Sequence, residues 1–245
     1  MRRGGAFYDL PGVLERYREP RPADVTDPNH VMEEPALLEA LGSAEGLRVV
    51  DLGCGDAALG RVLLRGGCAR YLAIDGSERM VEVARETLRG TAGEVERGDI
   101  EDFSAPPGVF DLVVSRMALH YVEDVRAALA ACHACLSPGG RIVFTVVHPV
   151  ITSHDARAST EDLRAAWVVD DYFAGGPREL DWLGGAVVWH HRTIEDYVAA
   201  LQDAGFSLTA LRECPPRRER FDGDAAEFAR RRRIPMFLLL AGARR

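Results

Sequence analysis

Residues 49–60, VVDLGCGDAALG, join an apolar run to a helix-forming run through a glycine-rich turn. Gly53 and Gly55 allow the backbone to bend sharply and to approach a ligand closely. The helix that follows begins with unpaired N–H groups, which favour an anionic part of a ligand. The stretch therefore predicts a nucleotide-type binding turn at the carboxyl end of a buried strand.

Predicted strands and helices alternate on both sides of this turn, up to residue 149. The predicted strands are residues 47–53, 70–76, 94–100, 109–116 and 141–149, and the predicted helices are 30–42, 57–67, 77–90 and 122–136, with a turn at 137–140. Such alternation with short apolar strands favours a parallel sheet covered by helices on both faces. We therefore predict an α/β fold with a Rossmann-like doubly wound sheet.

The alternation stops after the fifth predicted strand, at residues 150–193. This segment holds all three tryptophans, and an aromatic-rich insertion of this size is typical of a lid or a substrate wall. A helix and two strands follow, at residues 194–206, 207–214 and 234–243. The two strands are not joined by a crossover helix, so we predict an antiparallel C-terminal strand.

The length of 245 residues suits a single domain with a lid. We expect one domain over residues 1–245, with an N-terminal helical cap segment at 1–42 and the lid at 150–193 within it. No apolar run is long enough to span a bilayer, and no apolar stretch follows the N-terminal arginines, so we expect no signal peptide. Five scattered cysteines favour reduced thiols in a cytoplasm.

The net charge of −8 argues against a nucleic-acid partner, because such a protein needs a basic face to neutralise phosphates. All 30 basic residues are arginine, a bias typical of a GC-rich, bacterial coding sequence. The absence of lysine excludes a Schiff-base lysine, a lysine base and a P-loop lysine.

Three aspartates lie at the ends of the first three predicted strands. Asp51 comes just before the glycines, and Asp75 ends the second strand, where a carboxylate can accept both hydroxyls of a ribose. Asp99 ends the third strand, where it could accept from an adenine amino group.

With these residues the chain resembles the class I S-adenosylmethionine (SAM)-dependent methyltransferases over residues 47–149. The motifs that carry the resemblance are VVDLGCGDAALG, YLAIDGSERMVEVAR, GDIEDF, FDLVVSRMALHYVED and LSPGGRIVFTVVHP. Two later stretches, WHHRTIEDYVAALQDAGF and RRRIPMFLLLAGA, resemble more weakly a small-molecule branch of that family, the methyltransferase type 11-like branch.

The resemblance implies SAM as cofactor, S-adenosylhomocysteine as product, and a role for each matching residue. The residues implied to hold the methionine part are Asp51, Gly53, Cys54 and Gly55, and those implied to hold the ribose are Asp75 and Gly76. Met80, Asp99 and Ile100 would contact the adenine. Ser115 would lie beneath the methyl donor, and Tyr17 would close over the cofactor. Ala57 stands where many members have a third glycine, and we expect its small methyl group to be tolerated.

An NAD-dependent dehydrogenase is the nearest alternative, since it also has glycines after the first strand and an acidic residue after the second. Its G-x-G-x-x-G fingerprint fits poorly, because Gly60 is out of register with Gly53 and Gly55. Asp51 and Asp99 also favour SAM.

Two histidines follow strands whose carboxyl ends should meet at the site. His120 follows the fourth strand and His148 ends the fifth. Each is a candidate to deprotonate or orient a methyl acceptor, because the histidine pKa lies near neutrality. The alternatives are that His120 caps a helix or packs beside the cofactor, and that His148 bonds a backbone carbonyl before Pro149.

The stretch VVWHHRT brings two more histidines together. Adjacent residues of an extended segment point to opposite faces, so His190 and His191 cannot share one ligand. We expect a substrate contact from His191 and Trp189, and no metal site. Thr193 with Asp196 predicts a capping box that starts the next helix.

Three further features favour structural roles. The CHAC stretch at 132–135 lacks a second Cys/His pair, so packing thiols are favoured over zinc. The arginine run at 230–233 suits a helix end. Asp170 and Asp171 suit a solvated loop better than a metal pair.

These observations predict transfer of a methyl group from SAM to an oxygen or nitrogen of a small, partly apolar metabolite in biosynthesis, mainly by proximity and orientation. The same site could instead drive a cyclisation, a decarboxylation or an aminocarboxypropyl transfer, or bind SAM without catalysis. We expect a small-molecule acceptor as partner, no nucleic acid or membrane, and a monomer or homodimer.

Overall fold

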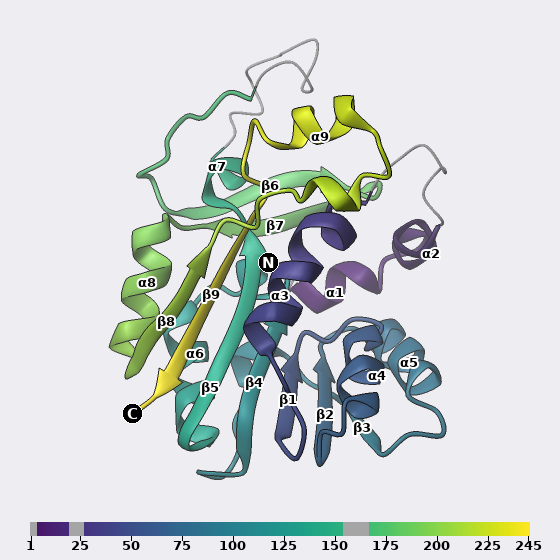
Figure 1. The fold of residues 1–245 in the computed structure, drawn as a ribbon, viewed down its shortest axis with the longest axis vertical. Helices are drawn as coiled ribbons and strands as arrows, with labels where there is room; N and C mark the ends of the chain where they lie inside the picture. Colours follow the sequence, from purple (N-terminus) through teal and green to yellow (C-terminus); the bar gives the residue numbers. More distant parts are fainter. Residues whose placement is uncertain (1–3, 20–26, 154–166) are drawn as a thin grey trace.

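Figure 1 shows the chain as a computed structural model, which describes residues 4–19, 27–153 and 167–245. The strands are β1 (Arg48–Leu52), β2 (Arg70–Asp75), β3 (Gly93–Arg97), β4 (Phe110–Arg116), β5 (Leu136–Val147), β6 (Gly176–Trp182), β7 (Gly185–His191), β8 (Phe206–Arg212) and β9 (Phe237–Arg244). The helices are α1 (Gly4–Tyr8), α2 (Val13–Arg18), α3 (Glu34–Leu41), α4 (Ala58–Arg65), α5 (Glu78–Thr87), α6 (Val125–Cys135), α7 (Pro149–Thr152), α8 (Ile194–Asp203) and α9 (Ala225–Arg231). Short π or 3-10 turns are η1 (Asn29–Glu33), η2 (Ile100–Asp102), η3 (Leu119–Tyr121) and η4 (Arg218–Arg220).

The main sheet has the strand order β3-β2-β1-β4-β5-β9-β8. Strands β1 to β5 are parallel, whereas β9 is antiparallel to both of its neighbours. The predicted Rossmann-like sheet with an antiparallel C-terminal strand is confirmed. One local expectation was wrong: residues 137–140 form the start of β5 instead of a separate turn, and the pairing of β4 with β5 breaks register there.

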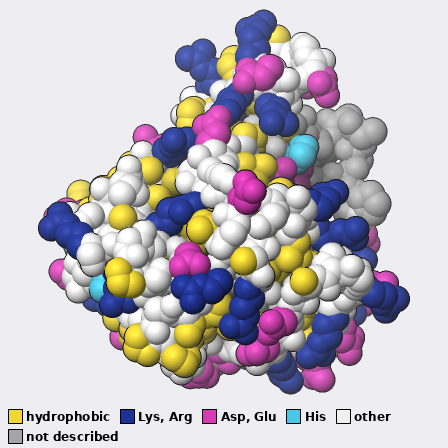
Figure 2. All heavy atoms as spheres, turned by 60° about the horizontal axis from the view of Figure 1, so that its bottom comes forward, with side chains coloured by type: hydrophobic (Ala, Val, Ile, Leu, Met, Phe, Trp, Pro, Cys, Tyr) yellow, Lys and Arg dark blue, Asp and Glu magenta, His cyan; other side chains and the backbone are white. Residues whose placement is uncertain are grey.

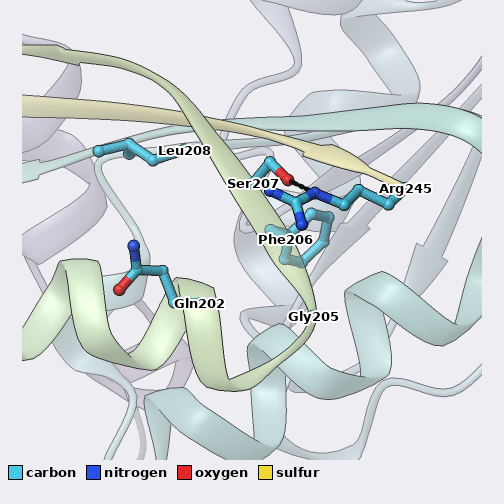
Figure 3. Close-up of a pocket in the computed structure, with 6 residues that line it drawn as sticks. All are labelled: Gln202, Gly205, Phe206, Ser207, Leu208 and Arg245. Carbon is cyan, nitrogen blue, oxygen red and sulfur yellow. Dashed lines mark hydrogen bonds between the residues drawn. The ribbon is translucent and has the colours of Figure 1, made fainter.

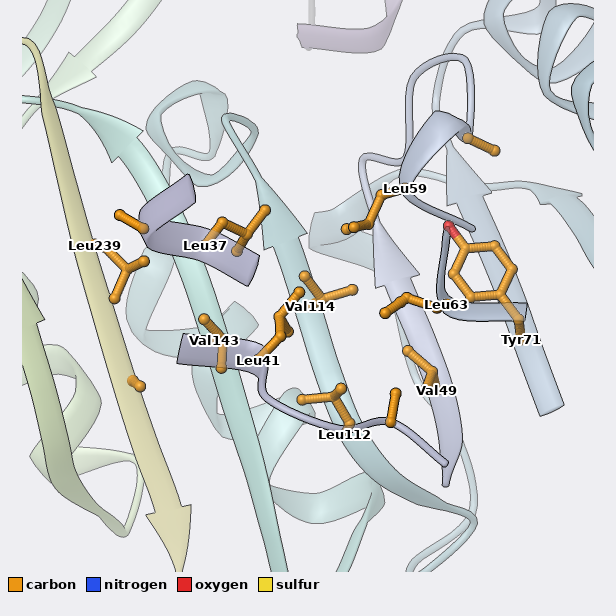
Figure 4. Close-up of a cluster of buried hydrophobic side chains, with 14 of the residues drawn as sticks. Leu37, Leu41, Val49, Leu59, Leu63, Tyr71, Leu112, Val114, Val143 and Leu239 are labelled. Carbon is orange, nitrogen blue, oxygen red and sulfur yellow. The ribbon is translucent and has the colours of Figure 1, made fainter. Parts of the chain in front are cut away.

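Helices cover the sheet on both faces, and neighbouring residues of a strand point to opposite faces. Each inner strand therefore contributes side chains to two separate cores. Val49 of β1 packs with side chains of α3 and α4, in the cluster drawn in Figure 4. Val50, the next residue, packs with side chains of α6 and α8 on the other face. Both valines are fully buried, as expected for a strand that helices cover on both faces.

Several helices, among them α5 and α8, begin where the sequence signals a cap. Ser77 accepts a hydrogen bond from the Met80 N–H at the start of α5. At α8, Thr193 accepts from the Asp196 N–H and the Asp196 carboxylate accepts from the Thr193 N–H, which confirms the predicted capping box. Each cap satisfies N–H groups that a helix start leaves unpaired.

Two segments cover the carboxyl edge of the parallel strands (Figure 1). The strap, residues 4–18, contains α1 and α2, and the hairpin consists of β6 and β7 from the expected lid region. Phe7 and Val13 of the strap and Val187 of the hairpin bury one another in a separate small core. Residues 1–3, 20–26 and 154–166 of the expected cap and lid lie outside the described residues. In the described part of the chain, no helix is long and apolar enough to cross a membrane.

Candidate cofactor and acceptor site

The glycine turn after β1 folds back onto the end of β2. The N–H groups of Gly53 and Cys54 both donate to the Ile74 carbonyl, at 2.8 and 3.0 Å. Gly53 has a φ of 73°, and a Cβ at this position would collide with the Cβ of Ala118. Gly55 also has a positive φ, with open space beside it. The turn is therefore a sharply bent stretch of backbone that a larger residue at 53 would disrupt.

Asp75 lies directly beside this turn. Its Oδ2 accepts from the Gly55 N–H and its Oδ1 from the Ser77 N–H, both at 2.9 Å. Burial raises the pKa of Asp75 to about 6, and these two hydrogen bonds oppose the rise. Each oxygen keeps a second lone pair. The carboxylate is thus held in place with acceptor capacity left for a vicinal diol such as that of a ribose.

Asp51 is the second buried carboxylate of this edge, with 1% of its surface exposed. Its Oδ2 accepts from the Tyr71 hydroxyl at 2.6 Å, whereas Oδ1 has no hydrogen-bond partner among the described residues. Burial raises the pKa of Asp51 to about 7. A positively charged ligand group would compensate this carboxylate, so the site fits the cationic methionine part of SAM.

The expected adenine residues lie on the next strand ends. A Cβ on Gly76 would lie 2.5 Å from the Asp99 Oδ1, and one on Gly53 would lie 3.3 Å from the Ile100 side chain. Met80 is buried in the first turn of α5. Ser115 differs from expectation in one respect: its hydroxyl donates to the Leu52 carbonyl at 2.8 Å and so joins β4 to β1.

The strap packs on the end of β2, where sequence reasoning placed no contact. A Cβ on Gly5 would lie 2.5 Å from the Gly76 carbonyl carbon, so the two backbones touch. The Asp9 carboxylate accepts from the Ser77 hydroxyl at 2.6 Å and from the Arg79 N–H at 3.1 Å. Asp9 thereby adds a second cap to α5. The only sequence signal for this contact is the small Gly4-Gly5 pair ahead of an acidic residue.

Aromatic side chains of the strap, η3 and the hairpin meet above this edge. The hydroxyls of Tyr8 and Tyr121 are 3.2 Å apart, and Tyr17 packs edge-on against Tyr8. The His120 ring lies between Tyr121 and Trp189, with ring centroids 4.3 and 5.4 Å away. The structure thus brings the expected Tyr17, His120 and Trp189 into one aromatic cluster.

The histidines differ in how they are bonded. Burial, with a smaller effect of Arg192, lowers the pKa of His120 to about 3, and its Nδ1 has no hydrogen-bond partner in the part of the chain that the structure describes. His148 Nδ1 accepts from the Val150 N–H, and its Nε2 lies 3.1 Å from a Glu213 carboxylate oxygen. This arrangement caps α7 and gives His148 a structural role, although the bonded backbone group is the Val150 N–H and not the expected carbonyl.

His191 also has protein partners at both ring nitrogens. Its Nδ1 lies 2.6 Å from the Thr152 hydroxyl and its Nε2 lies 2.8 Å from the Tyr172 carbonyl. These bonds fasten the hairpin to α7 and leave neither nitrogen for a substrate, contrary to the contact expected for His191.

The remaining features do not converge on a site. Cys132 and Cys135 are buried in α6, and Arg230 and Arg231 pair with Glu227. No group of three or more His, Cys, Asp or Glu side chains that could hold a metal ion occurs within the described ranges. Figure 2 shows basic and acidic side chains interspersed on the face that it presents. A shallow pocket lies at the start of β8, the opposite end of the sheet from Asp51 and Asp75 (Figure 3).

Comparisons with known proteins agree with this geometry. A family model described as a methyltransferase domain matches residues 50–144. The crystal structure of an SAM-dependent methyltransferase from Mesorhizobium loti is 38% identical, with a TM-score of 0.79 over 86% of this chain and 97% of that chain. A Haemophilus influenzae protein without a named activity is 27% identical over 218 residues, which are 85% of each chain. A ubiquinone biosynthesis O-methyltransferase from Ralstonia nicotianae is 31% identical over 148 residues, 56% of this chain and 62% of that enzyme. The chain therefore belongs to the class I SAM-dependent methyltransferase family, with SAM as its cofactor.

Proposed function

We propose that this methyltransferase acts on an oxygen or nitrogen atom of a small, partly apolar metabolite. The observation that carries the proposal is the pair of buried carboxylates, Asp51 and Asp75, beneath an aromatic cover that includes His120. Bound SAM supplies a methyl group that is already activated by the sulfonium charge. The protein then has to orient the acceptor and keep out water, which can contribute about 7–11 kcal/mol.

The cofactor contacts follow the strand ends. Asp51 would pair with the ammonium group, and the carboxylate of Asp75 would accept from the ribose hydroxyls. The other proposed contacts are Gly53, Cys54 and Gly55 with the methionine part, Gly76 with the ribose, Met80, Asp99 and Ile100 with the adenine, Ser115 through its backbone beneath the methyl group, and Tyr17 from the strap.

His120 and Trp189 would contact the acceptor, since both belong to the aromatic cover. A histidine with a pKa of about 3 is neutral at physiological pH and is a weak base. This supports catalysis by proximity and orientation over strong base catalysis. His148 and His191 would act as positioning residues of α7 and the hairpin, because their ring nitrogens are already bonded.

We also propose a monomer or homodimer that works in a bacterial cytoplasm on biosynthetic intermediates. All five cysteines are free thiols, as a reducing compartment favours. The similar Ralstonia nicotianae protein is named for ubiquinone biosynthesis, which supports an acceptor from biosynthesis but does not identify it.

Calorimetric titration with S-adenosylhomocysteine and with NAD tests the cofactor site. We expect micromolar binding of S-adenosylhomocysteine and none of NAD. Asp75→Ala should weaken binding by about 100-fold or more, since two hydrogen bonds to a charged acceptor are lost. Asp203→Ala is the matched control, because Asp203 pairs with Arg126 on the surface. Binding of NAD, or an unchanged affinity in Asp75→Ala, would overturn the proposed site.

Product analysis with SAM and a panel of small acceptors tests the reaction. S-adenosylhomocysteine together with a methylated acceptor would support methyl transfer. Methylthioadenosine would show that the aminocarboxypropyl chain moved, and unchanged SAM with a converted acceptor would indicate a cyclisation or decarboxylation. Tight binding without any product would indicate a non-catalytic SAM-binding protein.

A further inference from the structure

Buried polar side-chain atoms almost always have a hydrogen-bond partner, because leaving one without a partner is destabilising. Three such atoms lack one in the described part of the chain: Asp51 Oδ1, His120 Nδ1 and Trp189 Nε1. Asp51 belongs to the cofactor edge. The other two lie on rings that meet edge-to-face, with centroids 5.4 Å apart. Two unsatisfied atoms thus lie on neighbouring rings from η3 and β7.

The indole N–H of Trp189 can only donate a hydrogen bond. Burial raises the pKa of Tyr121 and the nearby Trp189 N–H opposes that rise, but the geometry between the two groups does not make a hydrogen bond. His120 is 2% exposed and neutral, so its ring has one donor nitrogen and one acceptor nitrogen. The pair therefore offers a fixed donor beside a nitrogen that can accept.

A charged ligand group is disfavoured beside His120 and Trp189. Arg192 is the one charged residue, within the described ranges, that shifts the His120 pKa. Its guanidinium donates to the Val122 and Glu123 carbonyls at 2.6 and 2.5 Å and stacks on Tyr197. A carboxylate beside His120 would be buried without a free cation, and an ammonium group cannot accept from the indole N–H.

We propose that His120 and Trp189 together recognise a neutral hydroxyl group of the acceptor. The hydroxyl oxygen accepts from Trp189 Nε1–H, and its O–H donates to His120 Nδ1. This inference rests on the proposed function and narrows the acceptor to an alcohol or phenol. Both ring atoms are shielded from solvent, so the hairpin that carries Trp189 has to move outward for the acceptor to enter.

Nuclear magnetic resonance on the full chain, 15N-labelled and saturated with S-adenosylhomocysteine, tests this with phenol as the probe. The Trp189 indole signal is identified by its loss in Trp189→Phe. We expect phenol to move this N–H proton downfield and toluene to leave it in place. Benzoate and benzylamine should bind at least tenfold more weakly than phenol. Equal or tighter binding of benzoate, benzylamine or toluene would overturn the proposal.

Two variants separate recognition from structure. His120→Phe removes an unsatisfied buried nitrogen and keeps a ring, so Tm should stay level or rise while phenol binds at least tenfold more weakly. Trp189→Phe should weaken phenol binding by the same factor, and this variant remains informative if His120→Phe fails to fold. Trp182→Phe is the matched control, because Trp182 lies on the neighbouring strand and is 38% exposed, with its ring centroid 6.5 Å from that of Trp189. A lower Tm with unchanged phenol binding would assign His120 to structure alone.

The proposed function fails in a different way. If S-adenosylhomocysteine does not bind at all, the cofactor site is wrong. If it binds and methyl transfer occurs only to amines or carboxylic acids, the methyltransferase assignment stands and the hydroxyl assignment is overturned.

Discussion

Asp51 shows how burial sets the chemistry of a single residue. Its pKa is raised to about 7, so the folded chain holds this proton at pH values where the unfolded chain has lost it. A carboxyl group of this kind stabilises the fold fully below its unfolded pKa of about 4, and this contribution is lost as the pH rises through about 7. The change between pH 5 and pH 8 is about 3 kcal/mol.

Asp51→Asn removes this titration and keeps the shape of the side chain. Between pH 5 and pH 8, urea unfolding should show that the unchanged protein loses about 3 kcal/mol more stability than the variant. His120 acts in the opposite direction, because its lowered pKa adds stability as the pH rises from about 3 to about 6.5. Since His120 is present in both proteins, their difference isolates Asp51. Equal slopes for the two proteins would show that Asp51 ionises normally in the fold.

For single residues, the sequence predicts their place in the fold better than it predicts their hydrogen-bond partners. Asp75 ends β2 and His148 follows β5, where the strand pattern predicted them, whereas His191 ends β7, a strand that the pattern did not predict. The partners of the two histidines could not be predicted, because Glu213 is 65 residues from His148 and Thr152 is 39 residues from His191. Such bonds depend on how distant segments pack, and a local pattern contains no information about that.

The strap is an element with one very close contact. The backbone of Gly5 touches Gly76, and a Cβ at Gly5 would lie 2.5 to 2.8 Å from three backbone atoms of Gly76 and Ser77. Backbone atoms cannot move aside as a flexible side chain can. Any larger residue at this position therefore has to lift α1 from the end of β2.

Gly5→Ala should displace the strap while the main sheet stays folded. Hydrogen–deuterium exchange should become at least tenfold faster in residues 4–18, with unchanged protection in β1, β4 and β5. Gly175→Ala is the control, since a Cβ there would meet only the His191 carbonyl at 3.6 Å, an ordinary contact. Unchanged exchange in the strap would mean that α1 does not rest on Gly76 in solution.

The sequence predicts helices and strands that have a clear hydrophobic periodicity or a cap residue, and it does not predict those that lack both. The five parallel strands and the capping box of α8 follow from periodicity and cap residues. The hairpin was expected only as an irregular lid. Along β6 partly buried and exposed residues alternate without a fully buried one, so the strand has no apolar face that a sequence pattern could reveal.

At the scale of the whole molecule, the N-terminal strap and the late hairpin form one cover. Phe7, Val13 and Val187 share a small core, and the Arg16 guanidinium donates to the Leu183 carbonyl at 2.7 Å. The two strands of the hairpin pair only with each other within the described residues, and a two-stranded sheet is marginally stable alone. The strap therefore supplies packing that the hairpin needs, and the two should open together.

Val187→Ala tests this coupling, because it removes two buried methyl groups from the shared core without changing the strap. The loss should destabilise the cover by about 1–3 kcal/mol. Exchange should accelerate in residues 4–18 as well as in β6 and β7, while the main sheet keeps its protection. Val169→Ala, at a position 44% exposed, should change neither segment. Faster exchange in the hairpin alone would show that the strap and the hairpin move independently, and the acceptor would then enter by displacing only the strands that carry Trp189.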